Sequence, residues 1–223
     1  MEFIQKFIKN NRPGTPLIPK GVVIHETGNA KGADAMAHYN YWNSSPDAKS
    51  SAHIVLDQKQ IIQLIPYTER AWHAGKTANS RFIGLEICRC VPFDKAKFDT
   101  EWEAAVGFTA AIFRDVLGEE QVTADNLLSH SEVSKRWGET DHTDPDGYFA
   151  KGGKSMDDFR REVAARLEKK TSYDETVNNM INDRITAAEN APYWERVLAG
   201  EEAANPDYIR AILDRYHKRV EGE

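Results

Sequence analysis

Two histidines and an aspartate, in three separate segments, carry side chains that could hold a metal ion. His25 ends a short apolar run, and His130 follows a second one. Asp144 lies fourteen positions after His130, where Pro145 favours an extended conformation for the residue before it. Two imidazoles and one carboxylate leave a position of a tetrahedral Zn²⁺ open, and an open position is typical of the catalytic zinc of hydrolases.

The third ligand position has several candidates. Spacing alone does not choose Asp144 over its neighbours, because three further side chains of suitable type stand close to it: Asp141, His142 and Asp146. Two other histidines, His38 on a predicted helix and His217 in a charged terminal segment, are interpreted as packed or solvated side chains. Two histidines and a carboxylate also suit other divalent ions.

Glu86 is an acidic residue inside an apolar, alternating run over residues 82–88. A carboxylate is costly in such a strand unless it is paired or faces a polar cleft. One interpretation is an ion pair with Arg81 or Arg89 at a strand end. The other is a general base directed at a metal-bound water, with a pKa tuned by partial burial.

The elements that must position these residues alternate between strands and helices. Apolar periodicity predicts strands over residues 21–27, 51–57, 60–65 and 82–88, and helices over residues 33–42, 101–116 and 156–167. Only two residues separate the second and third strands, which predicts a tight hairpin. This order predicts an α/β domain over residues 1–170, with a mixed sheet flanked by helices.

Residues 171–223 are predicted to form a small helical domain of three short helices. This segment has 11 acidic and 6 basic residues. At this size it can bury little apolar surface alone. We therefore expect it to pack on the first domain, to form homo-oligomers, or to bind a partner.

The composition excludes several classes of protein. The chain has 223 residues and a formal net charge of −6, which argues against a nucleic-acid-binding protein. Its two cysteines cannot form a disulfide framework, and no apolar run is long enough for a membrane span. The first residues lack the layout of a signal peptide, so we expect synthesis in the cytoplasm without export by that route.

Six short motifs in this order resemble the type 2 N-acetylmuramoyl-L-alanine amidases, a zinc amidase family that includes phage endolysins, muropeptide-recycling amidases and peptidoglycan recognition proteins. The motifs are VIHETGN (23–29), SAHIVLD (51–57), AWHAG (71–75), IGLEI (83–87), SHSE (129–132) and TDP (143–145). The resemblance spans roughly residues 20–168. It implies a central mixed sheet with zinc in a groove on one face.

The resemblance also implies roles for individual residues. The zinc ligands would be His25, His130 and Asp144, with Glu86 as the catalytic glutamate. His142 stands where many members have a lysine that stabilises the oxyanion, so this chain departs from the family there. The residues implied to line the groove or lie near it are Asn29, His53, Trp72 and His73.

The implied reaction is cleavage of the amide between N-acetylmuramic acid and L-alanine of the peptidoglycan stem peptide. A phage or prophage endolysin, acting on the wall after release, is the preferred interpretation because of the added helical tail. Three alternatives remain: a cytosolic amidase that recycles soluble muropeptides, a recognition protein that binds wall fragments without cleavage, and a structural zinc domain whose tail is the functional part.

Overall fold

The computed structural model describes residues 1–119, 121–168, 191–199 and 201. The chain divides into two compact units, residues 1–164 and 165–223. Within the second unit, helix α7 (Ala191–Ala199) falls where the sequence predicts the middle one of three short helices. The predicted helices on either side of it lie outside the described residues. Among the described helices, none has the length and apolarity needed to cross a membrane.

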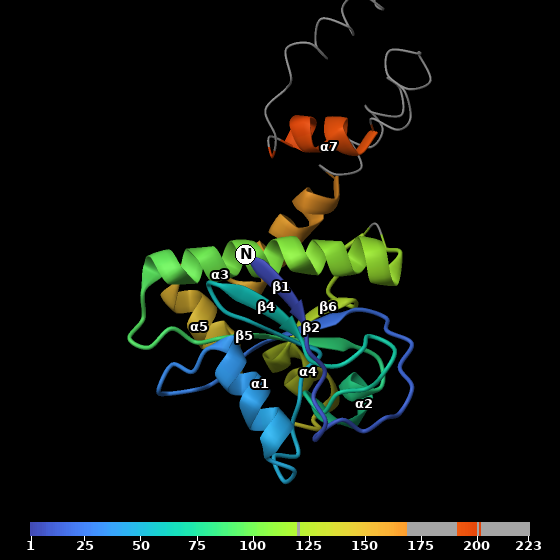
Figure 1. Ribbon diagram of the computed structural model, residues 1–223, viewed down its shortest axis with the longest axis vertical. Helices are drawn as coiled ribbons and strands as arrows, with labels where there is room; N and C mark the ends of the chain where they lie inside the picture. The colour runs from blue at the N-terminus through green and yellow to red at the C-terminus, as the bar shows by residue number, and fades with distance from the viewer. Residues whose placement is uncertain (120, 169–190, 200, 202–223) are drawn as a thin grey trace, which may run out of the picture. The chain divides into compact units, whose positions relative to one another are not determined.

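The first unit is built on a six-stranded mixed sheet, which Figure 1 shows. The strand order is β1-β4-β3-β5-β2-β6, and all neighbours are parallel except the antiparallel pair β3 and β4. The bounds are β1 (Glu2–Gln5), β2 (Val22–Glu26), β3 (Ile54–Leu56), β4 (Gln60–Gln63), β5 (Ile83–Ile87) and β6 (Leu127–Ser129). The predicted mixed α/β architecture is confirmed.

The hairpin between β3 and β4 is confirmed, and one side chain organises its turn. Asp57 Oδ1 accepts hydrogen bonds from the backbone N–H groups of Lys59 (2.7 Å) and Gln60 (3.0 Å). An aspartate that bonds its own following backbone forms such a turn without an Asn-Gly pair. Its Oδ2 accepts from the Ala35 N–H (2.9 Å), which ties the hairpin to helix α1 (Ala35–Ser44).

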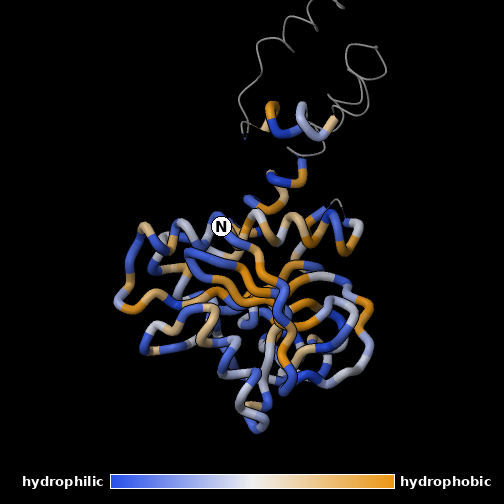
Figure 2. The backbone as a smooth tube through the Cα atoms, in the orientation of Figure 1, coloured by the Kyte–Doolittle hydropathy of each residue, from blue (hydrophilic) through white to orange (hydrophobic). Residues whose placement is uncertain are grey.

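Different helices pack against the two faces of the sheet. His25 on β2 and Glu86 on β5 are register partners, so both side chains point to the same face. Helices α1, α2 (Gly75–Asn79) and α4 (His130–Trp137) pack against this face. Helix α3 (Lys95–Ile112) crosses the opposite face in Figure 1, and Figure 2 shows apolar residues concentrated in the strands between these layers.

Helix α3 begins six residues before the predicted start. Asp94 caps it by accepting a hydrogen bond from the Lys97 N–H (3.1 Å). The first turn is mostly charged, so apolar periodicity does not reveal it. After Ile112 the helix continues as the π-helical turn η1 (Phe113–Leu117). The predicted helix over residues 156–167 is present over residues 156–168. Five short elements were not among those predicted: β1, β6, α2, α4 and α5 (Asp146–Lys151).

Candidate metal centre and its groove

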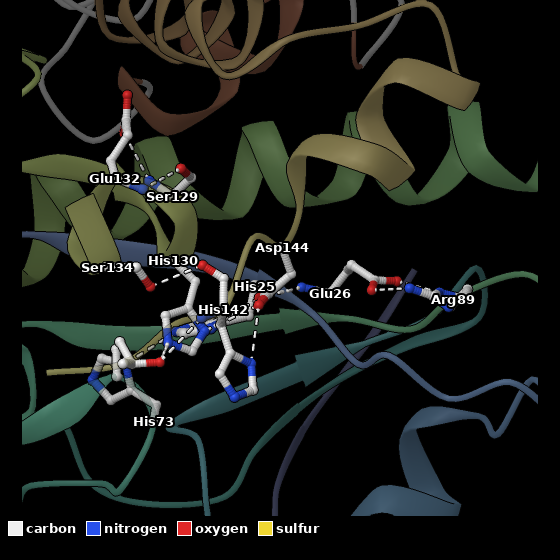
Figure 3. Close-up of polar contacts among 12 residues, drawn as sticks. His25, Glu26, His73, Arg89, Ser129, His130, Glu132, Ser134, His142 and Asp144 are labelled. Atoms are coloured by element: carbon white, nitrogen blue, oxygen red, sulfur yellow. Dashed lines mark hydrogen bonds and ion pairs between the residues drawn. The ribbon is translucent and has the colours of Figure 1, made fainter. Parts of the chain in front are cut away.

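The three predicted ligands come together at one end of the sheet, as Figure 3 shows. The Nδ1 atoms of His25 and His130 lie 3.0 Å apart. The Asp144 carboxylate lies 3.3 Å from His25 Nδ1 and 3.1 Å from His130 Nδ1. All three donor groups lie within 4.8 Å of one another. The structure therefore places an imidazole pair and a carboxylate around one point.

His130 is fixed by the start of helix α4. Ser129 ends β6 and caps the helix, with its Oγ accepting from the Glu132 N–H (3.1 Å). Glu132 in turn accepts from the Ser129 N–H (2.9 Å), which completes a capping box. The Glu132 carboxylate also pairs with Arg160. The first residue of α4 is thus held at the carboxyl end of β6, beside the end of β2.

Asp144 is held by backbone contacts on both sides of the site. Its carbonyl accepts from the Ser131 N–H (2.9 Å), and its Oδ2 accepts from the Glu26 N–H (3.3 Å). Burial opposes its charge, but hydrogen bonds with His130 and His25 hold the pKa of Asp144 well below its usual range. Among the described residues, Asp144 completes the group, and the competing carboxylates nearby do not.

The hydrogen bond made by His25 Nε2 determines which of the two ring nitrogens is free to bind a metal. His73 Nε2 lies 3.1 Å from the Phe82 carbonyl, so it carries a proton and donates it. His73 Nδ1 is then an acceptor, 3.1 Å from His25 Nε2. His25 therefore carries its proton on Nε2 and turns a lone pair on Nδ1 toward the site. A Cβ at Gly84 would meet the His73 ring at 2.7 Å, so glycine is needed there.

His130 is oriented in the same way. Its Nε2 lies 3.2 Å from Thr140 Oγ1, and with Nδ1 turned to a metal the ring would donate its Nε2 proton to this hydroxyl. Burial lowers the pKa of His25, which keeps that imidazole neutral. Two imidazoles and an ionised carboxylate, each with a hydrogen-bond partner outside the group, form the donor set of a catalytic zinc site. The residues fit the ion.

Glu86 lies beside the candidate metal ligands and makes no ion pair with another described residue. Its Oε2 is buried and lacks a hydrogen-bond partner. Burial, followed by the charges of Asp144 and Glu26, raises the pKa of Glu86 well above its usual range. The predicted alternative, an ion pair with Arg81 or Arg89, is wrong for the described residues, because Arg89 pairs with Glu26 and Arg81 makes no ion pair with Glu86. The buried carboxylate oxygen is available to a water or a substrate in the groove.

His142 lies at the rim of the site. Its ring stacks on that of His130, with centroids 4.6 Å apart and planes 12° from parallel. Its Nδ1 lies 3.5 Å from Asp144 Oδ1, and the side chain is 63% exposed. The exposed edge of the ring can therefore reach a group bound above the metal ligands.

A groove of about 860 Å³ opens over the metal centre. Asn29, Trp72 and His73, three of the four predicted substrate contacts, line it. The structure adds two residues of α1, Tyr41 and His38, which sequence reasoning did not select. Their spacing on one helix was visible, but nothing in the sequence showed that this helix forms a groove wall.

His53, the fourth predicted contact, lies behind the groove and does not line it. Its side chain is fully buried. Its Nδ1 accepts from the Gly84 N–H (2.9 Å), and its Nε2 donates to the Glu69 carbonyl (2.8 Å). Burial lowers the pKa of His53 to about 4, so the ring is neutral at ordinary pH. With both nitrogens used by backbone groups, it joins β5 to the loop after β4.

An α/β sheet with a two-histidine, one-aspartate centre and a buried glutamate defines a class, the metal-dependent hydrolases. The family model described as N-acetylmuramoyl-L-alanine amidase matches residues 13–147. The chain belongs to this family. The resemblance found in the ordered motifs is thereby confirmed.

Individual relatives agree with this assignment. The chain is 34% identical over 139 residues to N-acetylmuramoyl-L-alanine amidase XlyA of Bacillus subtilis, covering 58% of this chain and 43% of XlyA. It is 32% identical over 135 residues to the amidase CwlH of the same organism, covering 57% of this chain and 48% of CwlH. The chain thus matches less than half the length of either relative.

Solved structures show the same fold. The catalytic domain of XlyA superposes with a TM-score of 0.59 at 28% identity, covering 73% of this chain and 99% of that domain. The Staphylococcus aureus hydrolase AmiA, solved in complex with its ligand, gives a TM-score of 0.68 at 22% identity, covering 77% of this chain and 86% of the AmiA chain. At that identity the second likeness speaks for the fold alone.

Proposed function

We propose that this chain is a zinc-dependent N-acetylmuramoyl-L-alanine amidase, which hydrolyses the amide between N-acetylmuramic acid and L-alanine of peptidoglycan. One observation carries the proposal. Three donor atoms of His25, His130 and Asp144 converge beside Glu86, whose buried Oε2 has no hydrogen-bond partner among the described residues, at the floor of an open groove. Membership of the amidase family supplies the substrate class.

The residues divide the chemistry between them. Zinc in this site would polarise the scissile carbonyl and lower the pKa of water to about 7. Glu86 accepts the proton of the attacking water and passes it to the leaving amine. His142, exposed beside Asp144, donates a hydrogen bond to the developing oxyanion, a contribution of about 3–4 kcal/mol for a well-placed donor.

The preferred biological setting is lysis of the cell wall by an endolysin. A solved structure titled as a mutant endolysin from Bacillus subtilis is 30% identical, with a TM-score of 0.59, and covers 73% of this chain and 99% of that one. The open groove suits a polymeric substrate better than a closed pocket would. A recycling amidase should instead favour small soluble muropeptides, so rates on intact sacculi and on purified muropeptides separate the two settings.

Residues 171–223 are proposed to hold the enzyme on the wall or to join two copies of it. The support is compositional: the segment is acidic and too small to bury much apolar surface alone. Deleting it should lower affinity for sacculi, or convert a dimer to a monomer in sedimentation, while turnover of soluble muropeptides stays the same. A truncated protein unchanged in both respects would contradict this role. The enzyme would be made in the cytoplasm and reach the wall on release.

The test of the reaction is an assay of purified peptidoglycan for new L-alanine amino termini. The metal is removed with a chelator and zinc is then added back. The amidase proposal predicts that cleavage stops with the chelator and returns with zinc. Wall binding without cleavage in the zinc-loaded protein would instead favour a recognition protein, although the complete ligand set and Glu86 argue against that alternative.

A further inference from the structure

A second buried carboxylate, Glu101, lies away from the catalytic groove on helix α3. Its side chain is 1% exposed and makes no ion pair within the described part of the chain. Its neighbours along the buried stripe of the helix are apolar, among them Phe98, Trp102 and Ala105. A carboxylate in such surroundings is costly, and burial raises the pKa of Glu101 to about 7. Packing alone would favour an apolar residue at this position.

The carboxylate holds two groups from other elements. Tyr148 on α5 donates its O–H to Glu101 Oε2 at 2.9 Å. The Cys90 thiol lies 3.3 Å from Oε2 and 3.4 Å from Oε1. The Tyr148 oxygen also accepts the Cys90 N–H at 3.1 Å. One buried group therefore joins α3, the segment after β5 and α5.

Helix α5 follows the third metal ligand directly along the chain. The N–H groups of Tyr148 and Phe149 both donate to the Pro145 carbonyl, each at 2.9 Å. On its other side, the Asp144 carbonyl accepts from Ser131 in α4. Asp144 thus lies between two anchors, one to α4 and one to α3 through Tyr148. Tyr148 also lines the groove, whereas Glu101 does not.

We infer that Glu101 is a positioning residue, which acts through the Tyr148 hydroxyl to fix Asp144 for metal binding and to shape the groove wall formed by α5. The inference rests on the proposed function, because Asp144 matters here as a metal ligand. It assigns a role to a carboxylate that touches neither metal nor substrate.

Two variants separate this role from simple stability. Glu101→Leu replaces the buried carboxylate by an apolar side chain of similar size and leaves the Tyr148 hydroxyl and the Cys90 thiol without their acceptor, so the melting temperature is expected to fall as well. Tyr148→Phe removes the hydroxyl and keeps the ring, which packs on Phe98 with centroids 5.3 Å apart. Glu101→Gln, which keeps an acceptor oxygen, serves as the conservative variant. Zinc affinity is measured by competition with a chromophoric chelator, beside KM, kcat and the melting temperature.

We expect Glu101→Leu and Tyr148→Phe to weaken zinc binding on the order of 3- to 10-fold and to raise KM, with Glu101→Gln closer to the parent protein. The matched control is Glu162→Leu, which removes the carboxylate that accepts a 2.6 Å hydrogen bond from the indole of Trp102 on helix α3. The control should lower the melting temperature without changing zinc affinity.

The inference would be overturned if zinc affinity and KM were unchanged from the wild type in both Glu101→Leu and Tyr148→Phe. If Glu101→Leu fails to fold, the zinc affinity and KM of Tyr148→Phe, compared with those of Glu101→Gln, still test the inference. Zinc binding is read without any amidase assay. A wild-type protein that binds zinc but cleaves no peptidoglycan would therefore refute the proposed function and leave this test intact.

Discussion

His73 accepts the Nε2 proton of His25 across 3.1 Å, and the same ring donates its own proton to the Phe82 carbonyl. This chain of two hydrogen bonds selects the His25 tautomer that exposes Nδ1 to the other ligands. Thr140 Oγ1 lies within hydrogen-bond distance of the second nitrogen of His130. The orientation of the candidate metal ligands is therefore set partly by residues outside the ligand group.

Removing these outer partners should weaken metal binding. His73→Phe and Thr140→Val each remove the hydrogen-bond partner of an imidazole Nε2, so we expect zinc affinity to fall about 10- to 100-fold in each variant. Chelator competition measures the change. Thr77→Val is the control, since Thr77 Oγ1 binds Glu139 outside the groove (2.6 Å). Equal affinity in His73→Phe and the wild type would show that the tautomer is fixed in another way.

Glu86→Gln tests the proton-transfer step. The variant keeps the size of the side chain but cannot take a proton from water, so kcat should fall about 10²- to 10⁴-fold. Zinc content and melting temperature should stay close to wild type. Glu139→Gln, which alters a carboxylate outside the groove, should retain activity. A Glu86→Gln enzyme with near-normal turnover would remove Glu86 from the mechanism.

Zinc should stabilise the folded protein through the three ligands. A ligand that binds only the folded state adds about 2.7 kcal/mol at a free concentration 100-fold above its Kd. Thermal unfolding with zinc and with a chelator should therefore give different melting temperatures for the wild type. Asp144→Asn, which keeps the shape but loses the charge, should show a much smaller difference. An undiminished zinc shift in that variant would exclude Asp144 as a ligand.

Glu101 predicts a pH dependence of stability. Its pKa in the folded protein is about 7, above its ordinary value of 4.5. Between these values the folded protein holds a proton that the unfolded chain releases, so the free energy of unfolding falls as pH rises through this window. Relative to Glu101→Gln, the wild type should lose on the order of 1–3 kcal/mol between pH 4.5 and 8.

Urea unfolding of both proteins, in the presence of chelator, measures this difference at several pH values. The chelator removes the separate effect of pH on metal binding. Parallel pH dependences of the wild type and Glu101→Gln would contradict the raised pKa of Glu101.

The sequence predicted the parts of the fold that depend on apolar periodicity. The strand ending at His25, the hairpin after His53 and the strand holding Glu86 were all expected, and the ordered motifs pointed to the metal ligands. Glu86 was itself a signal, because burying a carboxylate inside an apolar strand is costly unless the carboxylate has a partner or a function.

Other features depend on contacts between distant segments and left no local signal. The burial of His53 behind the groove follows from its two backbone partners, Gly84 and Glu69, which sequence spacing cannot reveal. Glu101 looked like the polar start of a helix, yet it is buried against α5. The short β1 is held by its parallel pairing with β4, not by a pattern of its own.

The identity of the cleaved bond tests the central claim most directly. Mass spectrometry of muropeptides treated with zinc-loaded enzyme should show free N-acetylmuramic acid lactyl carboxylates and peptides that begin with L-alanine. The Glu86→Gln enzyme should yield neither product. Cleavage at a glycosidic bond or within the stem peptide, or products unaffected by the Glu86 substitution, would contradict the assignment of this site as a zinc amidase centre.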